Sequence, residues 1–293
     1  MAVGLAIICV EVSSGRYPGL AKPGRTEWLG HRGMTQFHWT WVGTRSTGTS
    51  HLRSGKGCDD FGACVELSSA GDRVLIAVAS DGAGSARHSS IGSWVTVRAF
   101  VGNAARFLKN GHPLTELSPE VIRGWLDDVR DRISMLARKH NAVPRDFAAT
   151  LVGSLIATNY ALFVHVGDGA SVFKARGSSE WIVASWPAQG EYAATTFFVT
   201  DDPEPHCRFV VVDEPVDEIA VFTDGIERLV LDFSRQSAFA PFFEKMFFPL
   251  KTSVAGRNRK LSRDLRRFLD SPSVCDKTDD DKTLILAKRI VGG

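Results

Sequence analysis

Few features of this chain would suit an extracellular protein or a zinc ribbon. Its 293 residues include only five cysteines, which are odd in number, scattered, and never spaced as CxxC. A disulfide framework and a zinc ribbon are both disfavoured by this pattern. We therefore expect a reducing compartment, which for this chain means the cytoplasm.

Strong charge of either sign and long apolar runs are also missing. The formal net charge is +2, and 23% of the residues are charged. This near balance gives no support for a nucleic-acid partner or for an anionic membrane surface. The apolar residues 5–10 are too few to span a bilayer, and no basic residues precede them as in a signal peptide. We therefore expect no nucleic acid and no membrane among the partners.

The first part of the chain differs in composition from the rest. Residues 13–33 are rich in glycine, arginine and proline and show no periodicity, which is typical of disorder. We expect residues 1–33 to be a disordered and dispensable leader, or upstream sequence that is not normally translated. The remaining residues 34–293 are then predicted to form a single domain.

Strand patterns occur in runs, whereas helix patterns occur in pairs. We expect strands at residues 37–43, 61–67, 73–79, 149–157, 160–166, 170–174, 181–185, 197–200, 208–213, 218–223 and 283–290. We expect helices at residues 89–108, 118–140, 236–247 and 258–269. Residues 47–57 are predicted to be a basic loop and residues 185–196 a flap. This order predicts an α+β fold of two packed sheets with helices outside.

Aspartates recur where apolar strand patterns begin or end. Asp81 follows a strand pattern and opens the small-residue sequence DGAGS, and Asp224 follows another strand pattern. Asp60 and Asp280 stand just before two more strand patterns. A buried carboxylate needs a partner because an unpaired buried charge is very costly. Four such positions predict carboxylates that converge on hard divalent cations.

Each aspartate has a simpler structural interpretation. Asp81 would be the N-cap of the following helix, and Asp224 a turn residue before a helix. The acidic run 279–281 would be solvated, although it enters a strand pattern almost directly. Asp168 stands in the turn Gly-Asp-Gly, where we favour a structural hydrogen-bonding role.

The order of these motifs resembles a known family over residues 37–290. The motifs are Asp60, Asp81-Gly82, Thr150, Gly167-Asp168, Asp224-Gly225 and Asp280-Asp281. They resemble the metal-dependent serine/threonine protein phosphatases of type 2C, and most closely their short bacterial branch. The opening GTSH at residues 48–51 and the GEY at residues 190–192 resemble further motifs of that branch. The resemblance implies a central β-sandwich of two mostly antiparallel sheets, flanked by helices on both sides, with two metal ions at one end.

The resemblance also implies a set of metal ligands. They are Asp81 as the carboxylate that bridges both ions, Gly82 through its backbone carbonyl, Asp60, Asp224 and Asp280, with Asp146 for a possible third ion. Mn²⁺ or Mg²⁺ suits ligands that are all oxygen. Two such ions supply a water of lowered pKa and Lewis-acid contacts to a phosphate, so no side chain is assigned as the nucleophile.

The sequence departs from the family pattern at two functional positions. Ala83 stands where some members have a proton-donating histidine, and Gly55 stands where many have a phosphate-binding arginine. The sequence does not decide which residue would take over phosphate binding. The candidates are Arg53, Lys56 and His51.

The expected function is hydrolysis of phosphoserine and phosphothreonine in phosphoproteins, with a serine/threonine kinase as the implied opponent. One alternative is a pseudophosphatase, a non-catalytic phosphoprotein-binding module with the same fold. The four ligand aspartates argue against it, because clustered carboxylates without metal repel one another. Another alternative is a different two-metal hydrolase such as a nuclease, against which the near-neutral charge weighs.

Overall fold

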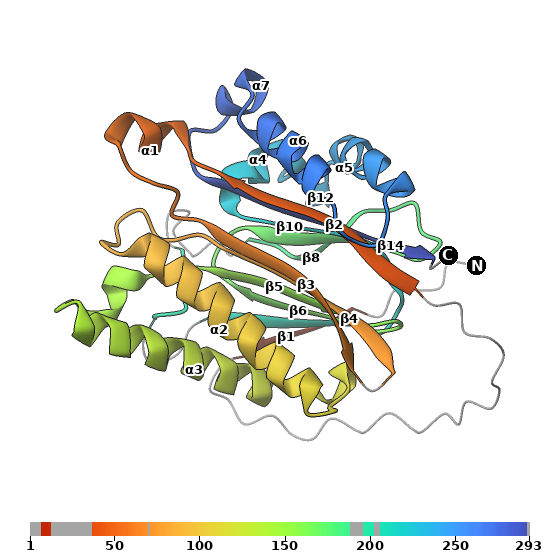
Figure 1. Cartoon of the computed structure of the whole chain (residues 1–293), viewed down its shortest axis with the longest axis horizontal. Helices are drawn as coiled ribbons and strands as arrows, with labels where there is room; N and C mark the ends of the chain where they lie inside the picture. The colour runs from red at the N-terminus through yellow and green to blue at the C-terminus, as the bar shows by residue number, and fades with distance from the viewer. Residues whose placement is uncertain (1–6, 13–36, 70, 188–195, 202–205, 292–293) are drawn as a thin grey trace.

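Two six-stranded sheets pack face to face in this protein (Figure 1). The structure is a computed structural model. It describes residues 7–12, 37–69, 71–187, 196–201 and 206–291.

The first sheet is antiparallel throughout and has the strand order β1-β9-β6-β5-β4-β3. Its strands are β1 (Ile7–Val12), β3 (Phe61–Ser69), β4 (Asp72–Ser80), β5 (Leu151–Ile156), β6 (Ala161–Val166) and β9 (Cys207–Val212). The hairpin of β3 and β4 and the succession of β5 and β6 follow the predicted strands. Three central strands are buried on both faces, which explains their nearly continuous apolar sequence.

The second sheet has the order β13-β2-β14-β10-β7-β8, and only β13 runs parallel to its neighbour. Its strands are β2 (Phe37–Ser46), β7 (Ala170–Ala175), β8 (Ile182–Ser185), β10 (Val216–Phe222), β13 (Gly256–Arg257) and β14 (Lys282–Val291). A two-stranded ribbon pairs β11 (Leu231–Asp232) with β12 (Ser237–Ala238). The chain therefore alternates between the sheets, so residues of both reach the same end of the sandwich.

Helices cover both outer faces of the sandwich (Figure 1). The α-helices are α1 (Thr49–Ser54), α2 (Ser89–Lys109), α3 (Pro119–Lys139), α4 (Glu227–Val230), α5 (Ala240–Phe247), α6 (Arg259–Leu269) and α7 (Pro272–Cys275). The 3₁₀ turns are η1 (Leu114–Glu116), η2 (Pro144–Phe147), η3 (Asp224–Ile226) and η4 (Phe248–Thr252). Helices α2 and α3 pack on the first sheet, whereas α5 and α6 pack on the second.

The buried apolar residues form three layers. One cluster lies between the first sheet and its helices, a second between the two sheets, and a third between the second sheet and its helices. Phe163 and Phe173 stack at 5.3 Å between ring centroids and join the sheets. The predicted sandwich with helices on both sides is confirmed.

Helix α3 shows how the sequence sets one of these covering helices. The Ser118 side chain accepts a hydrogen bond from the Val121 backbone N–H at 3.4 Å, and Pro119 occupies the first helical position. Four apolar residues at helical spacing are buried, namely Ile122, Leu126, Val129 and Ile133. Their spacing places them on one face of the helix, which therefore packs inward.

Several sequence-based expectations differ from the structure. Residues 7–12 form strand β1 beside β9, so this part of the expected leader is a strand, because β9 offers it an open edge. The remainder of 1–33 lies outside the described residues. The loop 47–57 contains helix α1. Residues 197–200 form no strand, and most of the expected flap lies outside the described residues. Within the described chain, no helix is both long and apolar enough to cross a membrane.

Candidate metal centre

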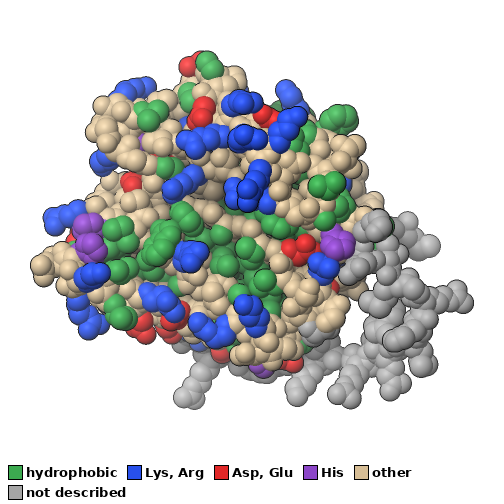
Figure 2. Space-filling model, viewed as in Figure 1, with side chains coloured by type: hydrophobic (Ala, Val, Ile, Leu, Met, Phe, Trp, Pro, Cys, Tyr) green, Lys and Arg blue, Asp and Glu red, His purple; other side chains and the backbone are tan. Residues whose placement is uncertain are grey.

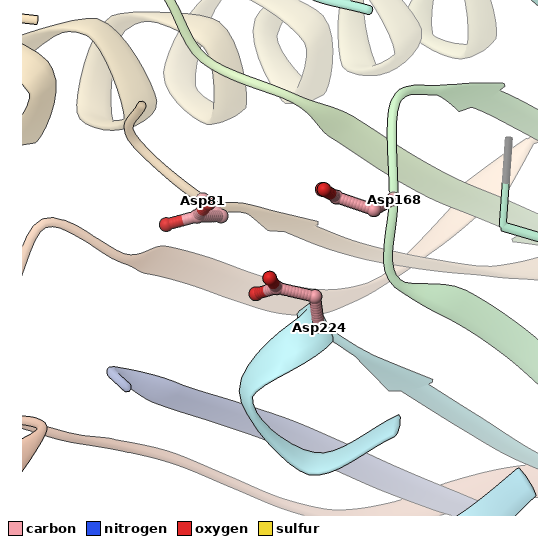
Figure 3. Close-up of side chains that lie close together, drawn as sticks. All are labelled: Asp81, Asp168 and Asp224. Atoms are coloured by element: carbon pink, nitrogen blue, oxygen red, sulfur yellow. The ribbon is translucent and has the colours of Figure 1, made fainter. Parts of the chain in front are cut away.

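Three carboxylates converge at one end of the sandwich (Figure 3). Asp81, Asp168 and Asp224 each offer an oxygen atom, and these atoms lie within 4.8 Å of one another. Asp81 follows β4, Asp168 stands in the turn between β6 and β7, and Asp224 begins η3 after β10. Both sheets therefore contribute to the same cluster.

The backbone around Asp81 is fixed by the neighbouring chain. Thr150 Oγ1 accepts a hydrogen bond from the Asp81 backbone N–H at 3.0 Å, and the Thr150 N–H donates to the Asp81 carbonyl at 2.8 Å. A Cβ atom on Gly82 would lie 2.5 Å from the Ser89 carbonyl oxygen, so only glycine allows this approach. Helix α2 begins at Ser89, which rules out the interpretation of Asp81 as its N-cap.

Asp60 lies beneath this cluster and is wholly buried. Its Oδ2 accepts a hydrogen bond from Thr223 Oγ1 at 2.7 Å, and its carbonyl oxygen accepts one from Arg45 Nη1 at 2.6 Å. Burial raises the pKa of Asp60 to about 7. Burial also raises the pKa of Asp81 well above its usual value, and the negative charge of Asp60 raises it further. The two carboxyl groups therefore interact directly.

Asp224 and Asp280 bring charge from the second sheet. Burial raises the pKa of Asp224 to about 9, with further contributions from Asp168 and Asp280. Burial raises the pKa of Asp168, and the charge of the exposed Asp280 raises it further. Asp280 therefore acts on the cluster from its solvent side.

Asp281 has a different role from its neighbour Asp280. Its side chain is buried, and Oδ1 accepts a hydrogen bond from the Gly48 N–H at 2.6 Å. Its Oδ2 accepts from the Asp59 N–H at 2.5 Å and lies 3.0 Å from His51 Nδ1. Asp281 thus fixes the segment that carries His51 beside the start of β14.

The residues of this cluster fit divalent cations. Within the described structure, no hydrogen-bond donor reaches the buried Oδ1 atom of Asp60, Asp168 or Asp224. Buried carboxylate oxygens normally have hydrogen-bond partners, so three buried carboxylate oxygens without a donor indicate a cation site. The available donors are all oxygen atoms, which suits Mg²⁺ and Mn²⁺. A bound cation would also offset the burial and the mutual repulsion that raise the pKa values of Asp81 and Asp224.

Asp168, for which the sequence predicts a structural hydrogen-bonding role, also lies in the carboxylate cluster. Its Oδ2 accepts a hydrogen bond from Thr196 Oγ1 at 2.8 Å, so the expected structural contact exists, but the carboxylate also belongs to the cluster. Gly167 and Gly169 have φ values of 99° and 83°, which lets the chain turn sharply and present Asp168 between them. An aspartate between two glycines at a strand end was the available signal.

Glu227 is a second acidic residue that the sequence did not suggest. Its Oε1 accepts a hydrogen bond from the Gly169 N–H at 2.7 Å, which ties helix α4 to the turn that carries Asp168. Burial raises the pKa of Glu227 to about 7, and the charge of Asp168 adds to this. Glu227 therefore supports the cluster from one side.

The structure does not bring Asp146 into the cluster. Its Oδ2 accepts a hydrogen bond from the Val143 N–H at 3.1 Å and closes the turn η2. Arg53 and Lys56, two of the phosphate-binding candidates, are exposed and contact no described aspartate. The third, His51, lies 3.0 Å from Asp281 Oδ2 through Nδ1 and 3.9 Å from Asp59 through Nε2. Of the three candidates, only His51 contacts aspartates of the described chain.

Comparison with known proteins agrees with this fold. The sequence profile of the family described as protein phosphatase 2C matches residues 47–270. Serine/threonine-protein phosphatase 3 of Escherichia coli is 30% identical over 253 residues, covering 85% of this chain and 98% of that protein. The chain therefore belongs to the protein phosphatase 2C family, which confirms the predicted family and enzyme class.

Solved structures show the same fold. The serine/threonine phosphatase Stp1 from Staphylococcus aureus matches with a TM-score of 0.57 and 16% identity, over 92% of this chain and 100% of that one. The catalytic domain of the serine/threonine phosphatase PstP, solved with two manganese ions, matches with a TM-score of 0.55 and 14% identity, over 87% and 100%. These proteins share the α+β sandwich with this chain.

Proposed function

We propose that this protein hydrolyses phosphoserine and phosphothreonine in phosphoproteins, using two divalent cations. The convergence of Asp81, Asp168 and Asp224, with orphaned buried oxygens, carries this proposal. The similarity to an E. coli protein named as a serine/threonine-protein phosphatase supports the substrate class.

The cations would be Mn²⁺ or Mg²⁺. We assign as ligands Asp60, Asp81, the Gly82 carbonyl, Asp168, Asp224 and Asp280, whereas Asp146, whose side chain closes the turn η2, is left out of this set. Bound cations of this kind supply Lewis-acid contacts to phosphate oxygens and lower the pKa of a bound water. Burial raises the pKa of Asp81, and the charges of Asp60 and Asp224 raise it further, which supports the assignment of Asp81 as a ligand of both cations.

Hydrogen bonds from neighbouring residues fix the positions of these ligands. Thr150 orients the backbone of Asp81, and Thr223 donates to the carboxylate of Asp60. Asp281 holds His51 at the start of β14, where we assign the imidazole a contact with a phosphate oxygen. Arg53 and Lys56 are exposed on the same segment and supply further positive charge for a phosphoprotein.

The test uses two substrates, an aryl phosphate and a phosphothreonine peptide. We expect the protein to hydrolyse both with Mn²⁺, to lose activity in chelator, and to regain it when Mn²⁺ is restored. Asp81→Asn should abolish turnover, whereas Asp131→Asn, an exposed residue of α3, should not. Activity that survives chelation would contradict the proposal. Peptide binding without turnover at any metal concentration would instead favour a pseudophosphatase.

We further propose that the protein works in the cytoplasm opposite a serine/threonine kinase. Four of the five cysteines, Cys58, Cys64, Cys207 and Cys275, are free thiols, in keeping with a reducing compartment. Proteins phosphorylated by a kinase of the same cell should lose phosphate when the purified protein and Mn²⁺ are added, and Asp81→Asn should leave them phosphorylated. Retention of all phosphate with the wild-type protein would contradict this pairing.

A further inference from the structure

A cavity of about 410 Å³ opens beside the metal centre, between the two sheets. Strands β2 and β3 form its floor, and helices α2 and α6 form its two rims. Figure 2 shows this face of the molecule, where Lys and Arg side chains gather around a hollow floored by apolar side chains. We call this cavity the arginine groove.

Four arginines line the arginine groove. They are Arg45, Arg98, Arg257 and Arg266, and no aspartate or glutamate lines it. All four are exposed. Within the described structure, Arg98 has no hydrogen bond or ion pair, and Arg257 contacts only the Gly43 carbonyl at 3.5 Å. The groove therefore presents positive charge that no carboxylate of its lining neutralises.

The remaining arginines are also largely available. Arg266 pairs only with Asp270 on its own helix, at 3.6 Å and in an exposed position, where such a pair is weak. Arg45 donates to a backbone carbonyl and lies 5.1 Å from the centre of the Phe61 ring. A planar guanidinium binds carboxylates and phosphates with two hydrogen bonds, which makes these side chains suited to anions.

The floor of the groove is an open sheet edge. Strand β3 is the outermost strand of its sheet, and no described strand pairs with its free side. Along such an edge, alternate backbone N–H and C=O groups point outward and can pair with an extended peptide. Trp41, Phe61 and Ala63 add apolar surface for its side chains. A nucleic acid would not pair with the strand edge as an extended peptide does, so these features favour a peptide.

The groove is directly connected to the metal centre. Phe61, at the start of β3, follows the buried Asp60, and Arg45 in the groove donates to the Asp60 carbonyl. Thr283, another lining residue, donates its backbone N–H to Thr223 Oγ1, which in turn donates to Asp60. A peptide in the groove would thus end close to the reacting phosphate.

We propose that the arginine groove binds an acidic segment of the phosphoprotein substrate, in extended conformation along β3. Its carboxylates would contact Arg98, Arg257 and Arg266, and its phosphorylated residue would reach the metal centre. The inference rests on the proposed function for the presence of a phosphorylated residue. It goes beyond that function because it specifies the sequence around the residue.

The test compares two phosphothreonine peptides of equal length, one with glutamates flanking the phosphothreonine and the other with glutamines. With Mn²⁺, we expect the wild-type kcat/KM to be about tenfold higher for the glutamate peptide, as a few exposed ion pairs would give. In the double variant Arg98→Gln, Arg257→Gln this ratio should fall to about one. The control double variant Arg138→Gln, Arg263→Gln removes the same charge outside the groove and should keep the ratio.

Equal rates on both peptides in the wild type, or an unchanged ratio in the groove variant, would overturn the proposal while leaving the phosphatase activity established. A second measurement distinguishes failure of the groove proposal from failure of the proposed phosphatase function. The fluorescein-labelled glutamate peptide without phosphate should bind Asp81→Asn, and the added groove substitutions should release it. Binding of this kind without turnover in the wild type would remove the proposed function and retain the acidic-peptide site. Tighter binding of a single-stranded oligonucleotide than of this peptide would overturn the groove assignment.

Discussion

The Thr223 hydroxyl donates a hydrogen bond to Asp60 Oδ2 at 2.7 Å and accepts one from the Thr283 N–H at 2.9 Å. This single buried hydroxyl links the end of β10, the start of β14 and the residue that precedes β3. It therefore joins the two sheets directly beneath the metal centre and sets the position of the Asp60 carboxylate.

Thr223→Val should weaken metal binding. The substitution keeps the shape of the side chain but removes the donor to Asp60, and loss of such a supporting hydrogen bond lowers metal affinity about 10- to 100-fold. Isothermal titration with Mn²⁺ measures the effect. Thr223→Ser retains the hydroxyl and should bind Mn²⁺ nearly as the wild type does. Equal affinities for the valine and serine variants would show that the contact does not position Asp60.

Asp168→Asn should weaken Mn²⁺ binding far more than Asp146→Asn. Asp168 belongs to the carboxylate cluster, whereas the Asp146 side chain closes a turn through the Val143 N–H. We expect a loss of affinity of about 10-fold or more for Asp168→Asn, measured by Mn²⁺ titration. The opposite ranking would return Asp168 to a purely structural role and place Asp146 at a cation.

The metal-free protein should lose stability as the pH rises. The pKa of Asp224 is raised to about 9 in the folded protein, from an ordinary value of 3.8. The folded state therefore holds this proton more tightly, and the stability it contributes is complete below about pH 4 and is lost as pH rises toward 9. Thermal unfolding in chelator between pH 5 and 9 should show a falling Tm.

Asp224→Asn supplies the control for this pH dependence. Without the titrating carboxyl group, the Tm in chelator should fall less steeply, and at pH 8 the variant should exceed the wild type by about 1–3 kcal/mol in free energy of unfolding. Mn²⁺ should stabilise the wild type more than the variant. A variant that is less stable than the wild type in chelator at pH 8 would contradict this explanation.

Asp281→Asn should destabilise the protein and loosen the segment around Gly48. Asp281 accepts hydrogen bonds from two backbone N–H groups, and bonds to a charged acceptor contribute about 1.5–3 kcal/mol each. Chemical denaturation gives the free energy of unfolding, and hydrogen exchange reports the Gly48 and Asp59 amides. The exposed neighbour Asp279 offers the control Asp279→Asn. Similar stability of both variants would refute the anchoring role.

A shortened chain that starts at Met34 should keep its activity but lose stability. It lacks β1, which forms six register pairs with β9, while every assigned ligand is retained. We expect an unchanged kcat toward an aryl phosphate, and a lower Tm because the edge of β9 is exposed. Loss of activity in a chain that remains folded would show that the first 33 residues act at the metal centre.

The sequence was sufficient to predict those parts of the fold that have strong periodicity. The apolar runs of β4 and β10 marked buried strands, and the aspartates at their ends marked the cluster. Helix α1 was missed because its six residues bury no side chain and so carry no apolar pattern. The position of Asp168 in the cluster was not predicted, because a Gly-Asp-Gly turn has the same sequence whether or not it faces other carboxylates. The four arginines of the arginine groove come from β2, α2, β13 and α6, and no local pattern contains them all.

The metal centre lies at the boundary between the two sheets, because Asp81 follows a strand of the first sheet and Asp224 follows a strand of the second. A cation bound by both aspartates would therefore fix the two sheets relative to each other. A shift of about 1 Å between the sheets would misplace these ligands, and a misplacement of that size lowers catalysis about 100-fold. The rate of turnover therefore depends strongly on how the two sheets are aligned.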